Sequence, residues 1–379
     1  MVKFNNLNAQ WLEIKDEAIP EIEELFKTSQ FILGPQVERF EESFAEFCSC
    51  DYGIGVSNGT DAIKIAAKAL DLGDAPGIFM PANTFVATWL AVREAYPNSQ
   101  ITMVDIDRYG QIDTKKLERN IINYRDSGGR DCLVVAVHMY GCCDAIDETS
   151  RIANNYNYRD GLHRCAVLED ASQAHGAKSP KGTLAGSVGE ISAFSLYPGK
   201  NLGAAGDAGI ITTNCENLAG KCRLLRNYGS KQKYVHEEIG YNHRLDSIQA
   251  IILYWKLQRL AVWNKSRSLV ADKIKLEVVN NRVGWMLTDN PLQVYHILPF
   301  LLKDFKNRNA FIDHLTDNSV EYGIHYPIPI HKMPFYQKVE SDLVQTEECS
   351  ERMVSLPIHP FLSDVEILQI AKAINTFGD

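Results

Sequence analysis

The chain has 379 residues, and its 39 lysines and arginines against 48 aspartates and glutamates give a net charge of −9. This acidic balance offers no basic surface for nucleic acid, and no apolar run approaches the roughly 20 residues of a membrane-spanning helix. With 45% hydrophobic and 23% charged residues, the composition is that of a globular enzyme of two or three domains, not a fibrous protein.

The start of the chain and its cysteines indicate a cytoplasmic location. Residues 1–15 are too polar for a signal peptide. The nine cysteines are scattered, and neither the Cys48–Cys50 spacing nor the adjacent Cys142 and Cys143 is matched by a second cluster, as a zinc site requires. We therefore expect reduced thiols and no metal site.

The first two thirds of the chain alternate helical and strand patterns. Residues 17–48 predict two helices interrupted at Gly34-Pro35, because glycine followed by proline breaks a helix and proline starts one well. Four short apolar runs predict buried strands: 101–105, 133–137, 166–169 and 209–213. Continuous apolar strands separated by helices are typical of a parallel sheet covered on both faces.

The last third has a different character. A long helix is predicted over 247–266. Short strand and helix signals follow, with seven prolines at 291, 299, 327, 329, 334, 357 and 360. We therefore expect an α/β fold with a large domain over 1–265, N-terminal helices included, and a smaller α+β domain over 266–379.

Residues 56–64 contain a Ser-Asn-Gly-Thr cluster that leads directly into a helical pattern. Backbone N–H groups and a hydroxyl would converge there at a helix N-terminus, which suits a phosphate. A plain helix cap with a flexible turn explains the same residues.

Residues 168–176 follow an apolar strand with acidic and polar groups. Side chains at the carboxyl end of a strand in an open α/β sheet are placed to bind ligands. Asp170 and Gln173 are three residues apart, so both could face one ligand. His175 either orients Asp170 or bonds within the loop, and a simple acidic turn remains the alternative for the whole segment.

Residues 193–209 place Lys200 between a predicted strand and a glycine-rich loop, with Ser195 and Tyr197 just before it. A lysine on such a short loop is a good Schiff-base nucleophile if its pKa is lowered, although an exposed surface lysine is the ordinary alternative. The spacing of the loop glycines does not fit a dinucleotide fingerprint.

Together these segments resemble a known family. Eight motifs occur in order along nearly the whole chain: FILGP (31–35), VSNGTD (56–61), PANTFVAT (81–88), EDASQAHG (169–176), YPGKNLG (197–203), GYNHRLD (240–246), IHYP (324–327) and LPIHP (356–360). The chain resembles the DegT/DnrJ/EryC1 family of sugar-nucleotide aminotransferases. The resemblance implies the aspartate-aminotransferase-like fold type I, with a mostly parallel central sheet between helices, and pyridoxal 5′-phosphate (PLP) as cofactor.

The resemblance assigns roles around the cofactor ring. Lys200 matches the lysine that binds the cofactor covalently and acts as general acid and base. Asp170 matches the carboxylate that keeps the pyridine nitrogen protonated, which makes the ring an electron sink. Gln173 matches the residue at the ring's 3-hydroxyl, and Phe85 matches the aromatic side chain that stacks on the ring.

The phosphate and the second subunit are implied in the same way. Gly59, Thr60 and Ser195 match phosphate contacts, in agreement with the helix-terminus argument. Asn242 matches an asparagine that reaches the phosphate from a neighbouring subunit, which implies a homodimer with shared active sites. The amino donor implied is L-glutamate, which becomes 2-oxoglutarate.

The stretches 84–91, 201–209, 228–234 and 323–329 resemble the branch that acts on dTDP-3-keto-6-deoxyhexoses. The sequence therefore favours amination at C3, and the alternative is a 4-aminotransferase acting on a dTDP-, UDP- or GDP-4-keto-6-deoxyhexose. Candidates for contact with the sugar and diphosphate are Tyr197, Tyr234, His325 and His331, each of which could equally be packing in a loop.

Two rival functions share the fold. Dehydratases of this type carry a histidine in place of the lysine, so Lys200 argues against them. A regulator that binds PLP without catalysis would usually carry a basic DNA-binding segment, which this chain lacks. The set of Lys200, Asp170, Gln173 and Asn242 also argues against a protein that has lost catalysis.

Overall fold

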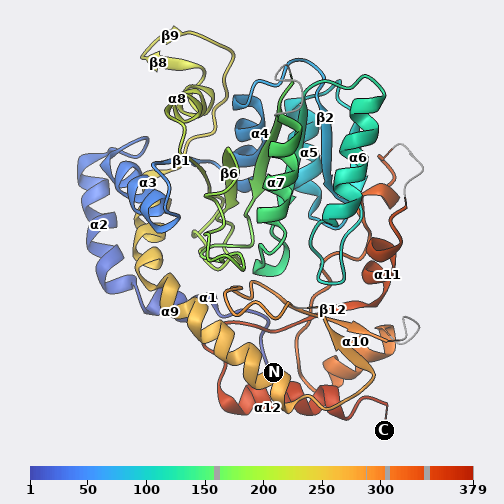
Figure 1. The fold of residues 1–379 in the computed structure, drawn as a ribbon. Coiled ribbons are helices and arrows are strands. Elements are labelled where there is room, and N and C mark those ends of the chain that lie inside the picture. Colours follow the sequence, from blue (N-terminus) through green and yellow to red (C-terminus); the bar gives the residue numbers. More distant parts are fainter. Residues whose placement is uncertain (158–162, 287, 304–307, 337–341, 379) are drawn as a thin grey trace.

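The structure is a computed structural model that describes residues 1–157, 163–286, 288–303, 308–336 and 342–378. Its centre is a seven-stranded sheet in the order β1-β7-β6-β5-β4-β2-β3 (Figure 1). The strands are β1 (Tyr52–Val56), β2 (Gly77–Pro81), β3 (Ile101–Val104), β4 (Cys132–Val137), β5 (Cys165–Asp170), β6 (Ile191–Ser195) and β7 (Gly209–Thr213). The four predicted strands are all present, as β3, β4, β5 and β7.

The sheet is mostly parallel, as predicted, but β7 is antiparallel to both of its neighbours, β1 and β6. Its register pairs Ser195, the last residue of β6, with Gly209, the first residue of β7. No helix lies between these two strands, and a parallel pair needs a crossover that carries the chain back along the sheet. The apolar run alone could not give the direction of this strand.

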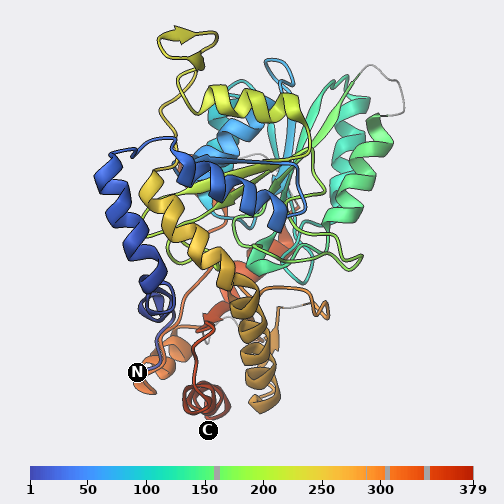
Figure 2. The same cartoon turned by 90° about the vertical axis from the view of Figure 1, so that its left-hand side faces the viewer.

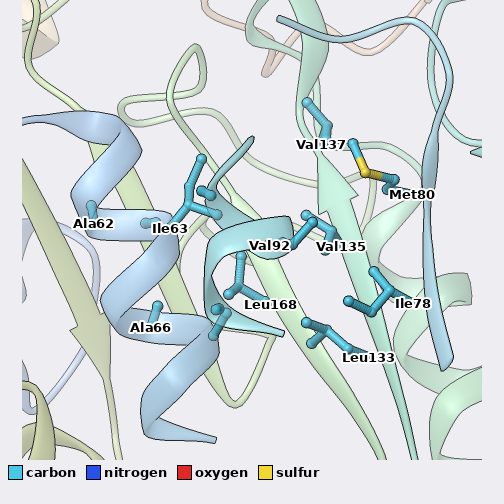
Figure 3. Packing of buried hydrophobic residues seen from close by; sticks show 14 of the residues in the cluster. Ala62, Ile63, Ala66, Ile78, Met80, Val92, Leu133, Val135, Val137 and Leu168 are labelled. Carbon is cyan, nitrogen blue, oxygen red and sulfur yellow. The ribbon is translucent and has the colours of Figure 1, made fainter. Parts of the chain in front are cut away.

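Alternate residues of the central strands face opposite sides of the sheet, and each side has its own core. On one side Ile78, Met80, Leu133, Val135 and Val137 pack against the helices α4 (Gly59–Ala69) and α5 (Val86–Ala95) (Figure 3). Helix α8 (Glu216–Leu225) contributes to the same core. On the other side Phe79, Cys132, Val134 and Ala136 pack against α3 (Pro35–Phe47), α6 (Thr114–Asp126), α7 (Ile146–Asn157) and the first half of α9 (Ser247–Glu277). This two-sided burial explains the continuous apolar strands.

The N-terminal helices are α1 (Leu7–Leu12) and α2 (Lys15–Thr28), followed by α3. The predicted break is confirmed: α2 ends at Thr28 and α3 begins at Pro35, with Gly34 as its N-cap. Within the described residues no cysteine is paired in a disulfide. No helix among the described residues is long and apolar enough to cross a membrane.

Helix α9 continues to Glu277, beyond its predicted end at 266, and crosses the molecule diagonally (Figures 1 and 2). Its first half packs on the large sheet, whereas Val270, Ala271 and Ile274 pack in the C-terminal core. These contacts with the C-terminal core stabilise the turns of α9 beyond residue 266. The predicted domain boundary at residue 265 lies inside this helix, and the division of the chain there stays a prediction.

The C-terminal part is built on an antiparallel sheet of β10 (Val283–Trp285), β11 (Leu298–Leu302) and β12 (Met353–Leu356). Helices α10 (Arg308–Asp317), α11 (Val344–Arg352) and α12 (Asp364–Asn375) accompany it. The N-terminus joins this part, because Val2 is buried in its core and bridges to Val320. A small hairpin of β8 (Ser230–Gln232) and β9 (Val235–His236) projects from the molecule at the end opposite the C-terminal part (Figures 1 and 2).

Candidate functional site

A cavity of about 770 Å³ lies at the carboxyl ends of β4, β5 and β6. Parallel strands bring their carboxyl ends to one edge of a sheet, so segments far apart in the sequence meet there. Nine of the twelve residues that the sequence singled out line this cavity: Gly59, Thr60, Phe85, Asp170, Gln173, Ser195, Tyr197, Lys200 and His325.

Lys200 lies on the loop between β6 and β7, where its backbone N–H donates to the carbonyl of Tyr197 at 2.9 Å. Burial lowers the pKa of Lys200 to about 8, against the opposing pull of the Asp170 carboxylate. The uncharged amine therefore becomes the major form above a pH of about 8, instead of above the ordinary lysine pKa. The condition that the sequence argument set for a nucleophilic lysine is met.

Asp170 is the last residue of β5 and is buried, with its carboxylate held at both oxygens. Oδ2 accepts a hydrogen bond from Thr88 Oγ1 at 2.7 Å, and Oδ1 accepts one from the N–H of Ser172 at 3.2 Å. Thr88 is itself bonded to Thr84 through their hydroxyls at 2.9 Å. Thr88 was not among the residues predicted from the sequence, although it lies in the first turn of α5, three residues after the N-cap Phe85.

Gln173 is oriented by two tyrosines that the sequence analysis did not single out. Its Oε1 accepts from the N–H of Tyr140 at 2.7 Å, and its Nε2 donates to Tyr326 Oη at 3.3 Å. Burial, and secondarily the charge of Asp170, raises the pKa of the Tyr326 phenol, which therefore stays protonated. Tyr326 also packs on Phe85, with ring centroids 5.5 Å apart, and half of the Phe85 side chain remains exposed.

The N-terminus of α4 forms a cradle for an anion. Asn58 caps the helix by accepting from the N–H of Asp61 at 2.9 Å, which leaves the N–H groups of Gly59 and Thr60 without a partner in the helix. A Cβ on Gly59 would lie 2.4 Å from the Cβ of Ser195. The close approach of helix and strand thus requires glycine, and it brings the Ser195 hydroxyl to the same point.

These residues fit PLP at each of its polar ends. The α4 cradle with Ser195 suits a phosphate, the fixed Asp170 carboxylate suits a protonated ring nitrogen, and Lys200 supplies an amine for an aldehyde. The structure shows the Asn58 cap that the sequence offered as one alternative, and phosphate binding at the same helix terminus stays a prediction.

His175 makes no hydrogen bond to Asp170. Its Nε2 bonds the backbone carbonyl of Ser195 at 3.0 Å, so this nitrogen carries the proton. Burial, and next the charge of Lys200, lowers the pKa of His175 to about 3. The sequence left two roles open for His175, and the structure shows hydrogen bonding within the loop region. The neutral side chain connects the 170–176 turn to β6.

Three predicted residues do not line the cavity of a single chain. Tyr234 lies at the tip of the β8–β9 hairpin and is 82% exposed. Asn242 is exposed on the segment that bridges to Asn227. His331 lies in the short helix η3 (Ile330–Lys332) and bonds Glu347 Oε1 through Nε2 at 3.0 Å.

Other segments complete the cavity without a recognisable motif. Phe4 and Asn5 line it, and Asn5 Nδ2 donates to the carbonyl of Gly199 at 3.4 Å, directly beside Lys200. His296 lines it from the segment before β11. Phe4 and Asn5 lie near the N-terminus and His296 lies about a hundred residues after Lys200, so no spacing rule relates them to the Lys200 loop.

Comparison with known proteins gives consistent matches over the whole chain. Residues 12–375 match the model of the DegT/DnrJ/EryC1/StrS aminotransferase family. The chain is 33% identical over 383 residues to the dTDP-3-amino-3,4,6-trideoxy-α-D-glucose transaminase of Streptomyces venezuelae, covering 100% of this chain and 96% of that protein. It is 35% identical over 381 residues to the dTDP-3-amino-3,6-dideoxy-α-D-galactopyranose transaminase of Aneurinibacillus thermoaerophilus, covering 100% of both.

Among solved structures, the chain superposes on DesV of S. venezuelae, determined in complex with a ketimine intermediate, with a TM-score of 0.89 at 33% identity. The match covers 99% of this chain and 97% of that one. The chain therefore shares the α/β fold with a mostly parallel sheet, and the prediction of fold type I is confirmed.

Proposed function

Because this chain belongs to the DegT/DnrJ/EryC1/StrS aminotransferase family, we propose that it transfers an amino group to C3 of a dTDP-linked 3-keto-6-deoxyhexose. The chain is a PLP-dependent nucleotide-sugar aminotransferase. The observation that carries the assignment is the convergence of Lys200, Asp170 and the α4 N-terminus on one cavity.

The position of amination is supported by the relatives. The two transaminases of S. venezuelae and A. thermoaerophilus both have 3-amino sugars in their names, and each aligns with the whole of this chain. The four stretches that resemble the 3-keto branch support the same choice. A 4-keto-6-deoxyhexose on a dTDP, UDP or GDP carrier is the second candidate.

The chain's own residues account for the steps. Bound PLP supplies an electron sink that stabilises negative charge on the carbon bearing the amino group. Asp170, fixed by Thr88, would hold the proton on the ring nitrogen, and Gln173 would donate to or accept from the ring oxygen. Lys200 Nζ would take the proton from that carbon and deliver it to the cofactor carbon that receives the amino nitrogen.

The amino donor and the dimer are parts of the same proposal. Glutamate would give up its amino group and leave as 2-oxoglutarate, and the keto-sugar would then receive the group. Asn242 would reach the phosphate of the PLP bound in a second copy, because it is exposed and does not line the cavity of its own chain. The active unit would be a homodimer with shared sites.

The test follows the visible absorbance of the PLP-loaded protein. Glutamate should bleach the colour, and dTDP-3-keto-6-deoxyglucose should restore it with formation of an amino sugar identified by mass. Lys200→Ala should abolish both changes, whereas Lys181→Ala, an exposed lysine outside the cavity, should behave as the wild type. Bleaching by glutamate without recovery would move the proposal to the 4-keto sugar, and absence of bleaching would contradict it.

A further inference from the structure

His296 is held in the cavity wall by its backbone. The segment before β11 pairs with the turn after β4: Val294 N–H donates to the Gly141 carbonyl at 2.9 Å, and His296 N–H donates to the Tyr140 carbonyl at 3.0 Å. The imidazole lines the same cavity as Lys200 and His325. Its place is therefore fixed by main-chain bonds, independent of the side chain.

The side chain of Asn201, directly after Lys200, determines which nitrogen of His296 carries the proton. Asn201 Nδ2 lies 2.9 Å from both the Val294 carbonyl oxygen and Asn264 Oδ1. A carbonyl only accepts, so the Asn201 atom that faces it must be the amide nitrogen. The other amide atom is then the oxygen, and it lies 3.2 Å from His296 Nδ1.

The oxygen of Asn201 also only accepts, so Nδ1 of His296 must be the N–H donor. In the neutral ring Nε2 is then an unprotonated acceptor. Among the residues that the structure describes, Nε2 has no hydrogen-bond partner. One side of the ring is tied to a buried amide, and the other offers a lone pair in the cavity.

The surroundings favour the neutral ring. Burial, then the positive charges of Lys200 and Arg267, with smaller contributions from His325 and His175, hold the pKa of His296 well below its usual range. A neutral imidazole with a fixed tautomer has one function to offer a ligand, which is to accept a hydrogen bond.

We propose that His296 contacts the substrate, and that its Nε2 accepts a hydrogen bond from an N–H or O–H group carried next to the reacting carbon. Two ligands of the proposed function carry such a group: the amino donor through its ammonium, and the keto-sugar through a hydroxyl. The inference rests on that function and adds a specificity-determining contact to it.

The experiment measures the two half-reactions separately in single turnovers, with L-glutamate and with dTDP-3-keto-6-deoxyglucose, as a function of ligand concentration. His296→Asn keeps an amide near the Nδ1 position, where it can still donate to Asn201, and removes the acceptor. We expect it to weaken at least one half-reaction about tenfold to a hundredfold, as for one lost hydrogen bond to a polar or charged group. His296→Gln, whose amide oxygen reaches the Nε2 position, should recover part of the loss.

The matched control is His314→Asn on α10, outside the cavity, which should react as the wild type. A loss confined to the glutamate half-reaction identifies the ammonium as the partner, and a loss confined to the sugar identifies the hydroxyl. Rates within about twofold of wild type in both half-reactions, or equal losses in the Asn and Gln variants, overturn the inference. Failure of the wild type itself to react would instead contradict the proposed function.

Discussion

At the scale of single residues, burial sets the protonation states of groups in and beside the cavity. Lys200 is pushed toward the neutral amine, Tyr326 toward the protonated phenol, and His175 toward the neutral ring. In each case removal from water disfavours the charged form. The resulting site pairs a nucleophilic amine with a carboxylate that is fixed by Thr88.

The pKa of Lys200 gives a pH prediction. Only the unprotonated amine attacks an aldehyde, so PLP should load into the apoprotein faster as the pH rises through about 8, with a plateau near pH 9. The rate is measured by stopped-flow absorbance between pH 6.5 and 10. A rate that still rises steeply at pH 10 would show a lysine with its ordinary pKa.

The carboxylate gives a second prediction. Asp170→Asn removes the negative charge that would keep the ring nitrogen protonated, so we expect turnover to fall by several orders of magnitude. An amide oxygen can still accept from Thr88, so the melting temperature should change little. Near wild-type turnover in this variant would mean that another group protonates the ring.

At the scale of elements, the site depends on how closely helix α4 approaches β6 and β7. A Cβ on Gly59 would lie 2.4 Å from that of Ser195, and one on Gly209 would lie 2.4 Å from the Asn58 carbonyl oxygen. The hairpin-like return from β6 to β7 carries the Lys200 loop past this same point. The two glycines are therefore required by packing between elements that are distant in the sequence.

A pair of glycine substitutions tests this packing. Gly59→Ala should displace Ser195 or α4 and weaken PLP binding about tenfold or more, while the protein still folds. Gly220→Ala lies inside α8, where an added Cβ meets nothing within 4 Å. It should leave PLP affinity unchanged and stabilise the fold by roughly 0.5–1 kcal/mol. Equal PLP affinities for the two variants would contradict the cradle.

At the scale of the whole molecule, the cavity draws on parts that no local pattern connects. The N-terminal Asn5 bonds Gly199 beside Lys200, and Tyr326 reaches Gln173 from the C-terminal part. Helix α9 packs on both cores and so sets the position of one relative to the other. Asn242 and Tyr234 are exposed and do not line the cavity of their own chain.

Mixing two inactive variants tests the shared site. A dimer of Lys200→Ala with Asn242→Ala contains one site with both residues intact, if Asn242 acts in the partner's site. Random exchange should then restore about a quarter of wild-type activity, because half of the dimers are mixed and each has one intact site of two. The activity is measured after co-refolding or co-expression, against each variant alone. No recovery would place Asn242 within its own subunit.

The family, the alternation of strands and helices and nine of the residues that line the cavity could be predicted from the sequence. These features depend on local spacing, such as the four apolar strand runs and the ordered motifs around Asp170 and Lys200. In a parallel sheet the motifs that follow the strands meet at one edge. The cofactor followed from the same residues through the resemblance.

The direction of β7 and the length of α9 could not be predicted, nor could the places of Thr88, Tyr326 and His296 at the site. Each depends on contacts between segments far apart in the chain: β7 on the absence of a crossover helix, α9 on a second apolar core, and the proton position on His296 on the amide of Asn201. Such contacts leave no periodicity in the sequence, because the local sequence of each segment is compatible with many different contact partners.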